Sequence, residues 1–267
     1  EGIINNANGA KSGNTKFLIP LAEREFCRTH LVKMSERAAR RGIQSKTKVF
    51  NGASLPIRPT LDDFHDLCGQ SKVLLLGERL TFCSDALSVP LISRQAFNVL
   101  FSGYNDLIHD GLLGSTLASM ASAGAFDDIV YFNGRGIEPR GGCGETSLAL
   151  GERFKAVRDI DQLPLQEIAD AIGKRRIALI IDGLDGEKTL HPIQIFKVPK
   201  PGDPQTPADL LKQIAEEGPR KGTFVFAFID NWRRCAAPCK DLLNLFELRV
   251  AFCMNEDDAG ALVSGGI

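Results

Sequence analysis

A chain of 267 residues with 43% hydrophobic and 24% charged residues has the composition of an ordinary globular protein, and it can hold one large domain with an appendage. The formal net charge of −1 excludes a general basic field for nucleic acid, although it is compatible with a local basic strip. The seven cysteines are odd in number and several lie in apolar runs, which favours free thiols in a reducing cytoplasm over a disulfide framework. No run of about 18 apolar residues occurs, so we expect no membrane contact from this segment.

The N-terminal part of the chain predicts a small strand–helix appendage. Residues 2–20 are rich in Asn and Gly and end in apolar side chains, which predicts a turn and an edge strand. Residues 21–41 predict a helix, and the polar, proline-containing residues 46–60 predict a linker. We therefore expect residues 1–60 to form an appendage and linker that follow an upstream module, and residues 61–267 to form the main domain.

Five short apolar runs, separated by helical stretches and loops, form the framework of the main domain. They cover residues 98–102, 129–132, 177–181, 223–229 and 248–252. Continuous apolar strands that alternate with helices are typical of a parallel sheet covered on both faces, so the fold class is α/β. Two further stretches, residues 73–76 and 85–92, predict an antiparallel addition ahead of this sheet.

The loop after the first of the five runs is the place to look for a ligand, because ligands bind at the carboxyl ends of parallel strands. The sequence predicts a strand that ends at Gly103, a loop as far as Gly111, and a helix from Leu112 onward. This is the arrangement of a phosphate-binding loop, which needs glycines, a lysine for the phosphate oxygens and a serine or threonine for magnesium. The pattern Gly-x-x-x-x-Gly-Lys-Ser/Thr does not occur in the chain.

The order and spacing of these elements resemble the FtsK/SpoIIIE (HerA-like) superfamily of P-loop ATPases, and the resemblance implies a RecA-like fold. It covers residues 75–266, and the segment from residue 246 to residue 258 is its sharpest part. Residues 126–133 and 154–160 are similar to the strands that follow the phosphate loop in that superfamily.

The resemblance places a vestigial nucleotide loop after the first strand. Its residues are Gly103, Asn105, Asp106, His109 and Asp110. Carried over residue by residue, Asp106 falls on a loop glycine, His109 on the lysine, and Asp110 on the serine or threonine.

The same resemblance suggests roles for Asp182 and for Arg233 and Arg234. Asp182 is similar to the magnesium-linked Walker B aspartate, but Gly183 stands where the catalytic glutamate would follow, and a turn aspartate explains Asp182 equally well. Arg233 and Arg234 follow a sensor-like strand, and such arginines can reach into a neighbouring subunit's site in multimeric ATPases. A buried Trp232 beside two solvated arginines is the alternative, and the sequence does not choose between them.

These substitutions argue against hydrolysis of a nucleotide. A histidine in place of the lysine is mostly neutral at pH 7. Each carboxylate near polyphosphate costs about 4 kcal/mol at a distance of ~4 Å and an effective dielectric of ~20. Without the glutamate, nothing at the expected position polarises the attacking water. We therefore expect Asp106, His109 and Asp110 to be exposed loop residues, with no cofactor unless the site still accepts ATP and magnesium.

Other cofactor sites find little support in the sequence. Cys235 and Cys239 could hold a metal only with two more ligands, and His191 is distant along the chain, so we expect no metal site. The glycine-rich residues 134–144 lack a full dinucleotide fingerprint and predict a flexible loop.

The favoured hypothesis is a non-catalytic, pseudo-ATPase domain of a larger motor of the DNA-translocase, defence or secretion type. Such a domain would be cytoplasmic, would follow an upstream ATPase module in the same polypeptide, and would act in homo- or hetero-oligomer assembly and in engagement of a partner or DNA. The alternatives are an active ATPase or DNA translocase domain with an atypical phosphate loop, and a protein-interaction scaffold with no nucleotide history.

Overall fold

The computed structural model describes part of the chain. The described residues are 2–5, 14–18, 23–43, 64, 73–78, 86–139, 143–191 and 204–263. Within them the chain divides into two compact units, Glu1–Val49 and Phe50–Ile267. The predicted linker at residues 46–60 lies outside the described residues.

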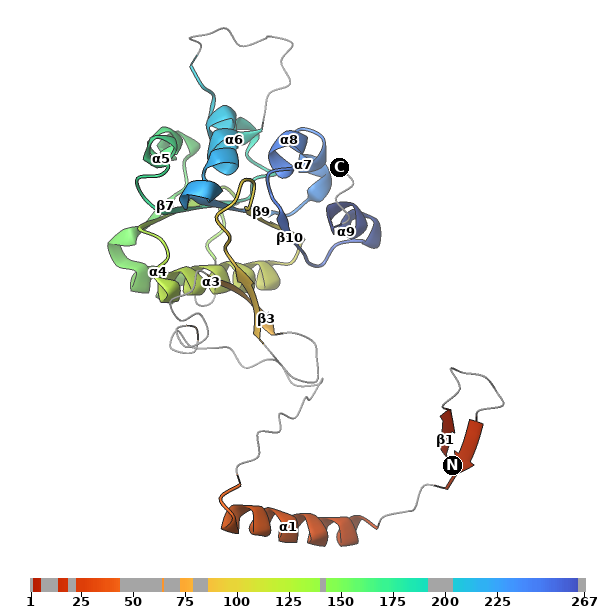
Figure 1. The fold of residues 1–267 in the computed structure, drawn as a ribbon. Helices are drawn as coiled ribbons and strands as arrows, with labels where there is room; N and C mark the ends of the chain where they lie inside the picture. Colours follow the sequence, from red (N-terminus) through yellow and green to blue (C-terminus); the bar gives the residue numbers. More distant parts are fainter. Residues whose placement is uncertain are drawn as a thin grey trace. The chain divides into compact units, whose positions relative to one another are not determined.

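The first unit contains the predicted strand and helix. Strands β1 (Gly2–Asn5) and β2 (Asn14–Phe17) pair antiparallel, and helix α1 covers Arg24–Arg40 (Figure 1). No side chain of α1 is buried within the described residues, so this helix has no core of its own.

A six-stranded parallel sheet forms the centre of the second unit, with the order β10-β5-β9-β8-β6-β7. The strands are β5 (Val99–Ser102), β6 (Asp128–Asn133), β7 (Phe154–Val157), β8 (Ile177–Asp182), β9 (Phe224–Ile229) and β10 (Leu248–Ala251). The five predicted runs are confirmed as strands of one parallel sheet, and β7 is the sixth. Because all strands point the same way, the ends of β5, β6, β8 and β9 meet at one carboxyl edge of the sheet.

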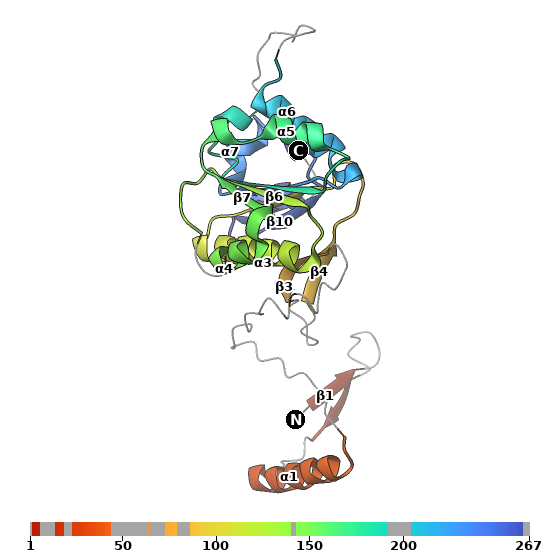
Figure 2. The same ribbon diagram turned by 90° about the vertical axis from the view of Figure 1, so that its left-hand side faces the viewer.

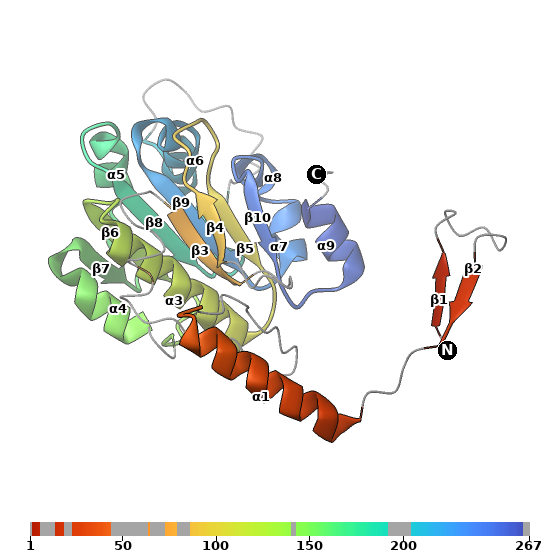
Figure 3. The same cartoon turned by 60° about the horizontal axis from the view of Figure 1, so that its bottom comes forward.

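Helices cover both faces of the sheet, which confirms the α/β class (Figure 2). Helices α3 (Asp106–Ala123) and α4 (Cys143–Leu150) lie on one face. The other face carries α5 (Leu165–Ala171), α6 (Pro207–Glu217), α7 (Trp232–Ala236) and α8 (Lys240–Leu243). Helix α9 (Glu256–Val263) packs beside β10 and α7 at the edge of the sheet (Figure 3). Short 3₁₀ turns occur at Gly151–Arg153, Ile160–Gln162, Lys188–Leu190 and Pro219–Lys221.

Strand β9 shows why a central strand can carry apolar side chains at consecutive positions. Its three phenylalanines, at positions 224, 226 and 228, face the core beneath α3, whereas the alternate residues Val225, Ala227 and Ile229 face the core beneath α5 and α6. All six are fully or almost fully buried. A strand covered on both faces has no solvent side, so the polar–apolar alternation of an exposed sheet is lost.

The antiparallel addition is present as a separate two-stranded sheet that packs on α3. Strands β3 (Val73–Glu78) and β4 (Ala86–Pro90) pair with each other, and β3 contacts α3. The hydroxyl of Ser115 donates to the carbonyl of Leu75 at 2.6 Å, and the backbone N–H of Leu75 donates to Ser119 Oγ at 3.0 Å. The hairpin thus shields the outer face of the helix that follows β5.

A buried asparagine joins three elements where β5 begins. The Nδ2 atom of Asn98 donates to the carbonyls of Ala215 and Leu245, each at 2.8 Å, and its Oδ1 atom accepts the backbone N–H of Val225 at 2.8 Å. Asn98 is fully buried. Its three hydrogen bonds therefore fix the start of β5 against β9, α6 and the segment before β10.

No described helix is both long and apolar enough to cross a bilayer.

Candidate functional site at the carboxyl edge of the sheet

The connection between β5 and α3 is only three residues long, residues 103–105. Asn105 caps the helix, because its side-chain oxygen accepts the backbone N–H of Ile108 at 3.0 Å. The prediction of a longer loop with a helix from Leu112 is wrong, because the cap starts α3 at Asp106. A phosphate loop presents free N–H groups to an anion. Here the Asn105 side chain accepts one of these N–H groups, that of Ile108, and Asp106 adds a negative charge in the first turn.

Gly103 is required by packing against the chain that follows β10. Its backbone N–H donates to the carbonyl of Ile229 at 3.1 Å. A Cβ atom at this position would lie 1.7 Å from the carbonyl oxygen of Phe252, which no relaxation of a side chain could relieve. Packing therefore explains the glycine at position 103 without any role in binding phosphate.

His109, the residue on the lysine position, is directed into the protein. Its Nε2 atom lies 2.8 Å from Oδ1 of Asp182, and its Nδ1 atom lies 3.3 Å from Oδ1 of Asp110. The imidazole also contacts the Phe228 ring edge-on, with 5.0 Å between ring centroids. The side chain of His109 is 2% exposed and that of Asp110 is 12% exposed, so the expectation of exposed loop residues is wrong for both. It holds for Asp106, whose side chain is 62% exposed.

Asp182, the residue on the Walker B position, has both carboxylate oxygens occupied. Oδ1 pairs with His109, and Oδ2 accepts the hydroxyl of Tyr131 at 2.9 Å. Asp182 is 1% exposed at the end of β8. Its partners lie on α3 and β6, so these three residues tie together the carboxyl edge where a P-loop fold would bind its nucleotide.

The surroundings of His109 both lower and raise its pKa. Burial lowers the pKa of His109, but the hydrogen bond to Asp182 and the charge of that carboxylate raise it more, so the net pKa lies above its usual value. Burial, and then the charge of Asp182, raise the pKa of Tyr131, so its hydroxyl stays protonated and donates. The arrangement favours an imidazolium–carboxylate pair with a neutral phenol beside it.

Arg135 closes the same edge from the segment after β6. Its guanidinium lies 2.6 Å from Oδ1 of Asp106 and, through Nε, 3.3 Å from Oδ2 of Asp230. The Arg135 side chain is 9% exposed. Burial raises the pKa of Asp230, and the positive charge of Arg135 opposes that rise. A Cβ atom added to Gly183 would lie 2.9 Å from Arg135 Cγ, so the arginine lies over the position on which the resemblance places the catalytic glutamate.

Sequence reasoning missed Arg135 because it lies between two glycines in a segment interpreted as a flexible loop. The available signal was a cation immediately after a predicted strand, at the edge where two predicted strands also end in aspartate. A buried edge rich in carboxylates requires a counter-charge. That argument would have identified the arginine as a structural partner.

Arg233 and Arg234, which the resemblance suggests could reach into a neighbouring subunit, lie in the short helix α7. Nε of Arg233 donates to Asp258 in α9 at 2.9 Å, although the Arg233 side chain is 69% exposed. Trp232 is buried, as the alternative expected. Arg234 follows in the same short helix, α7. Within the chain, Arg233 thus joins α7 to α9.

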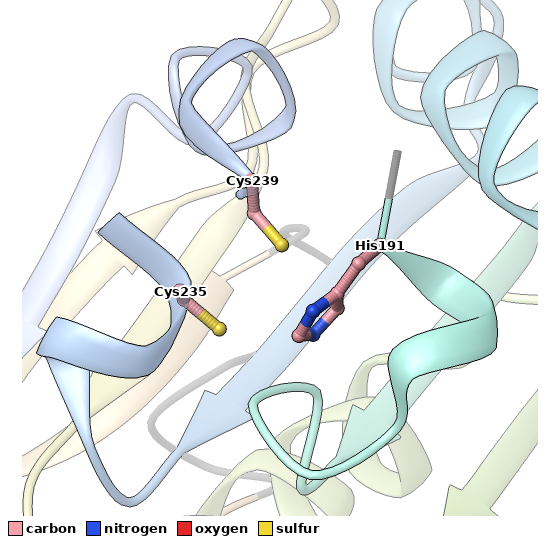
Figure 4. A group of neighbouring side chains, drawn as sticks. All are labelled: His191, Cys235 and Cys239. Atoms are coloured by element: carbon pink, nitrogen blue, oxygen red, sulfur yellow. The ribbon is translucent and has the colours of Figure 1, made fainter. Parts of the chain in front are cut away.

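The structure brings together three residues that the sequence analysis kept apart. His191, Cys235 and Cys239 offer ligand atoms that lie within 4.8 Å of one another (Figure 4). The objection that His191 is too distant along the chain is therefore wrong, because the turn after β8 returns to α7 and α8 in space. This cluster lies outside the His109–Asp182 site.

No protein-family model matches the sequence, and no curated protein matches it. Solved structures do match. The conjugation coupling protein TcpA of pCW3, in a monomer form with ATPγS, superposes with a TM-score of 0.52 at 13% identity, over 88% of this chain and 73% of that chain. The present chain shares the fold of a P-loop ATPase. The expected RecA-like α/β fold is confirmed, and the structure neighbours are of the FtsK/SpoIIIE type.

Two further ATPase structures give lower scores and are covered over smaller shares of their length. The cytoplasmic domain of the type VII secretion ATPase EccC of Thermomonospora curvata matches with a TM-score of 0.49 at 10% identity, over 85% of this chain and 28% of that one. EssC (ATPases 2 and 3) of Geobacillus thermodenitrificans matches with a TM-score of 0.48 at 13% identity, over 82% of this chain and 42% of that one.

Proposed function

We propose that this chain is a non-catalytic FtsK/SpoIIIE-like domain of a larger motor protein. The observation that carries the proposal is the buried contact of 2.8 Å between His109 Nε2 and Asp182 Oδ1. The residue on the lysine position and the residue on the magnesium position neutralise each other, so neither is directed toward a ligand. An active site of this class needs both groups to face the phosphates and the metal ion.

The electrostatics at this edge oppose polyphosphate. Asp106 stands in the first turn of α3, where the helix dipole would otherwise favour an anion. Arg135, the cation nearest to it, is already paired with Asp106 and Asp230. A bound nucleotide that recruited Arg135 would break these pairs and leave the partly buried Asp230 without its counter-charge, which opposes binding.

The exposed side chains of the former loop fit contact with a protein. Tyr104 is 74% exposed and Leu107 is 83% exposed, and both lie where a phosphate loop would carry small or polar residues. Aromatic and apolar side chains on a surface favour interaction with another protein. We propose that this edge acts in assembly, within a homo- or hetero-oligomer or against an upstream ATPase module of the same polypeptide.

The host process is part of the same proposal. Motors with this fold move DNA or protein cargo, and a cytoplasmic translocase, defence or secretion complex is the setting that we propose for this domain. Contact with DNA would then come through local basic side chains, because the whole chain carries a formal charge of −1. Arg233 and Arg234 remain the candidates for contact with a neighbouring subunit.

The proposal is tested by calorimetry with a non-hydrolysable ATP analogue, with and without magnesium. We expect no heat of binding up to about 1 mM, a range that would detect complexes as weak as roughly −4 kcal/mol. The Asp182→Asn variant is the matched control, because it removes the charge that magnesium requires and keeps the shape of the side chain. Magnesium-dependent binding that this variant abolishes, or ATP hydrolysis lost in the same variant, would instead support an active ATPase with an atypical loop.

A further inference from the structure

Two buried thiols and an imidazole ring point into the same space on the α7 side of the sheet (Figure 4). Cys235 lies in α7, and Cys239 is the residue that precedes α8. The backbone N–H of Cys239 donates to the carbonyl of Cys235 at 2.9 Å, which places both side chains on one side of a helical turn. Both cysteines are fully buried.

His191 approaches the thiols from the turn after β8 and has one ring nitrogen already oriented. Its Nε2 atom lies 2.8 Å from the carbonyl oxygen of Leu184, which fixes the proton on Nε2. Nδ1 is then the unprotonated nitrogen, with its lone pair available. Metal-binding histidines have this arrangement, because the second nitrogen donates to a carbonyl or carboxylate that fixes the tautomer and the ring orientation.

We propose that His191, Cys235 and Cys239 bind a zinc ion through Nδ1 and the two sulfur atoms. Two thiolates and one imidazole are a ligand set that zinc uses with a water or another group in the fourth tetrahedral position. Soft thiolate ligands select zinc over calcium or magnesium. This site is separate from the proposed pseudo-ATPase function and does not depend on it.

The distances are compatible with zinc after small rotations of the side chains. Tetrahedral zinc with Zn–S bonds of about 2.3 Å places two sulfur atoms about 3.8 Å apart. The three ligand atoms lie within 4.8 Å of one another, so closure requires at most about 1 Å of movement.

The ion would join two segments that meet behind the carboxyl edge. The turn that carries His191 begins directly after Asp182, and its Asp185 accepts the backbone N–H groups of Asp230 and Asn231, each at 3.2 Å. Zinc would add a second link between this turn and α7. It would also neutralise the two buried thiolates, whose charge is costly to bury alone.

The test is zinc content and cobalt substitution in the untagged, reduced chain. We expect stoichiometric zinc by elemental analysis after purification or after reconstitution of the metal-free chain. Cobalt in place of zinc should give the intense thiolate-to-cobalt charge-transfer band and the visible bands of tetrahedral cobalt. Cys235→Ser, Cys239→Ser and His191→Gln should each weaken zinc binding at least about tenfold. Cys253→Ser and His30→Gln are the matched controls, because neither residue belongs to the cluster, and both should bind as the parent chain does.

Three results would overturn the site. The first is the absence of a thiolate–cobalt band in the parent chain at saturating cobalt, a measurement that needs no variant to fold. The second is zinc binding that survives the cluster substitutions but disappears in a control variant, which would place the ion elsewhere. Spontaneous oxidation of Cys235 to Cys239 without metal affinity would assign the pair to thiol chemistry and would likewise reject the zinc site.

Discussion

The imidazole of His109 and the carboxylate of Asp182 are 73 positions apart in the sequence and 2.8 Å apart in the fold. The first belongs to the opening turn of α3 and the second ends β8, with β9 between β5 and β8 in the sheet. Their contact therefore spans a strand and fastens the helix after β5 to a strand that β5 does not touch.

This pair predicts a specific dependence of stability on pH. The pKa of His109 is raised in the folded chain, so the folded state binds the proton more tightly than the unfolded state. The stabilisation is complete below the unfolded pKa of about 6.5 and is lost as pH rises through the folded pKa. Urea unfolding of the parent chain between about pH 5.5 and 8.5 should show this loss, and His109→Gln should remove it. Parallel profiles for the two proteins would show that His109 does not titrate in this pair.

Arg135 should contribute more to stability than a surface ion pair does. Arg135→Ala removes one hydrogen bond to Asp106 and the ion pair with Asp230, and a hydrogen bond to a charged group contributes about 1.5–3 kcal/mol, so we expect a loss of about 2 kcal/mol. The control is Arg158→Ala, which breaks an exposed pair with Glu138 and should cost at most about 0.5 kcal/mol. Chemical denaturation measures both, and equal losses would contradict a special role for Arg135.

Asn98→Ala should cause a large loss of stability for a single core substitution. Asn98→Ala removes three hydrogen bonds and leaves the backbone N–H of Val225 and two carbonyls buried without that partner. An unsatisfied buried group costs about 1–3 kcal/mol, so the variant should lose roughly 3 kcal/mol or more. Gln166→Ala, which removes one exposed side-chain hydrogen bond in α5, is the comparison and should stay within about 0.5 kcal/mol of the parent chain. A loss from Asn98→Ala as small as that comparison would mean that water replaces the missing partner.

Two glycines that flank the start of α3 should respond in opposite directions to alanine. Gly103→Ala would place a methyl group against the Phe252 carbonyl and should destabilise the domain by several kcal/mol or prevent folding. Gly111→Ala meets no atom within 4 Å and lies inside α3, so it should stabilise the domain by about 0.5–1 kcal/mol. Thermal unfolding of the two variants compares them directly. Stabilisation by Gly103→Ala would show that β10 and its following residues pack elsewhere.

The framework of the second unit follows from its sequence because its central strands consist mostly of consecutive apolar residues. The run Phe224–Ile229, for example, cannot form an amphipathic surface, so it indicates a strand covered on both faces. The antiparallel pair β3–β4 was predictable from its two short runs. The local start of α3 was not predicted, because Asn105 acts as a cap only once the strand and helix are placed.

The candidate site was predicted in position but not in geometry. The sequence identified His109 and Asp182 separately, through their places on two motifs, and gave no reason for them to meet. Their contact depends on the rotation of α3 about its axis, which tertiary packing sets. The same limit applies to His191, whose approach to Cys235 is a property of the turn after β8.

The cap at Asn105 and the cover over Gly183 by Arg135 have one further consequence. A subunit that cycles needs an empty place at this edge, which nucleotide fills and leaves. Under the proposed function, the protein's own side chains take that place as soon as the chain folds. In a ring or stack of working ATPases, such a domain would keep one conformation while its neighbours change theirs at each turnover. It would then act as a fixed subunit in the assembly.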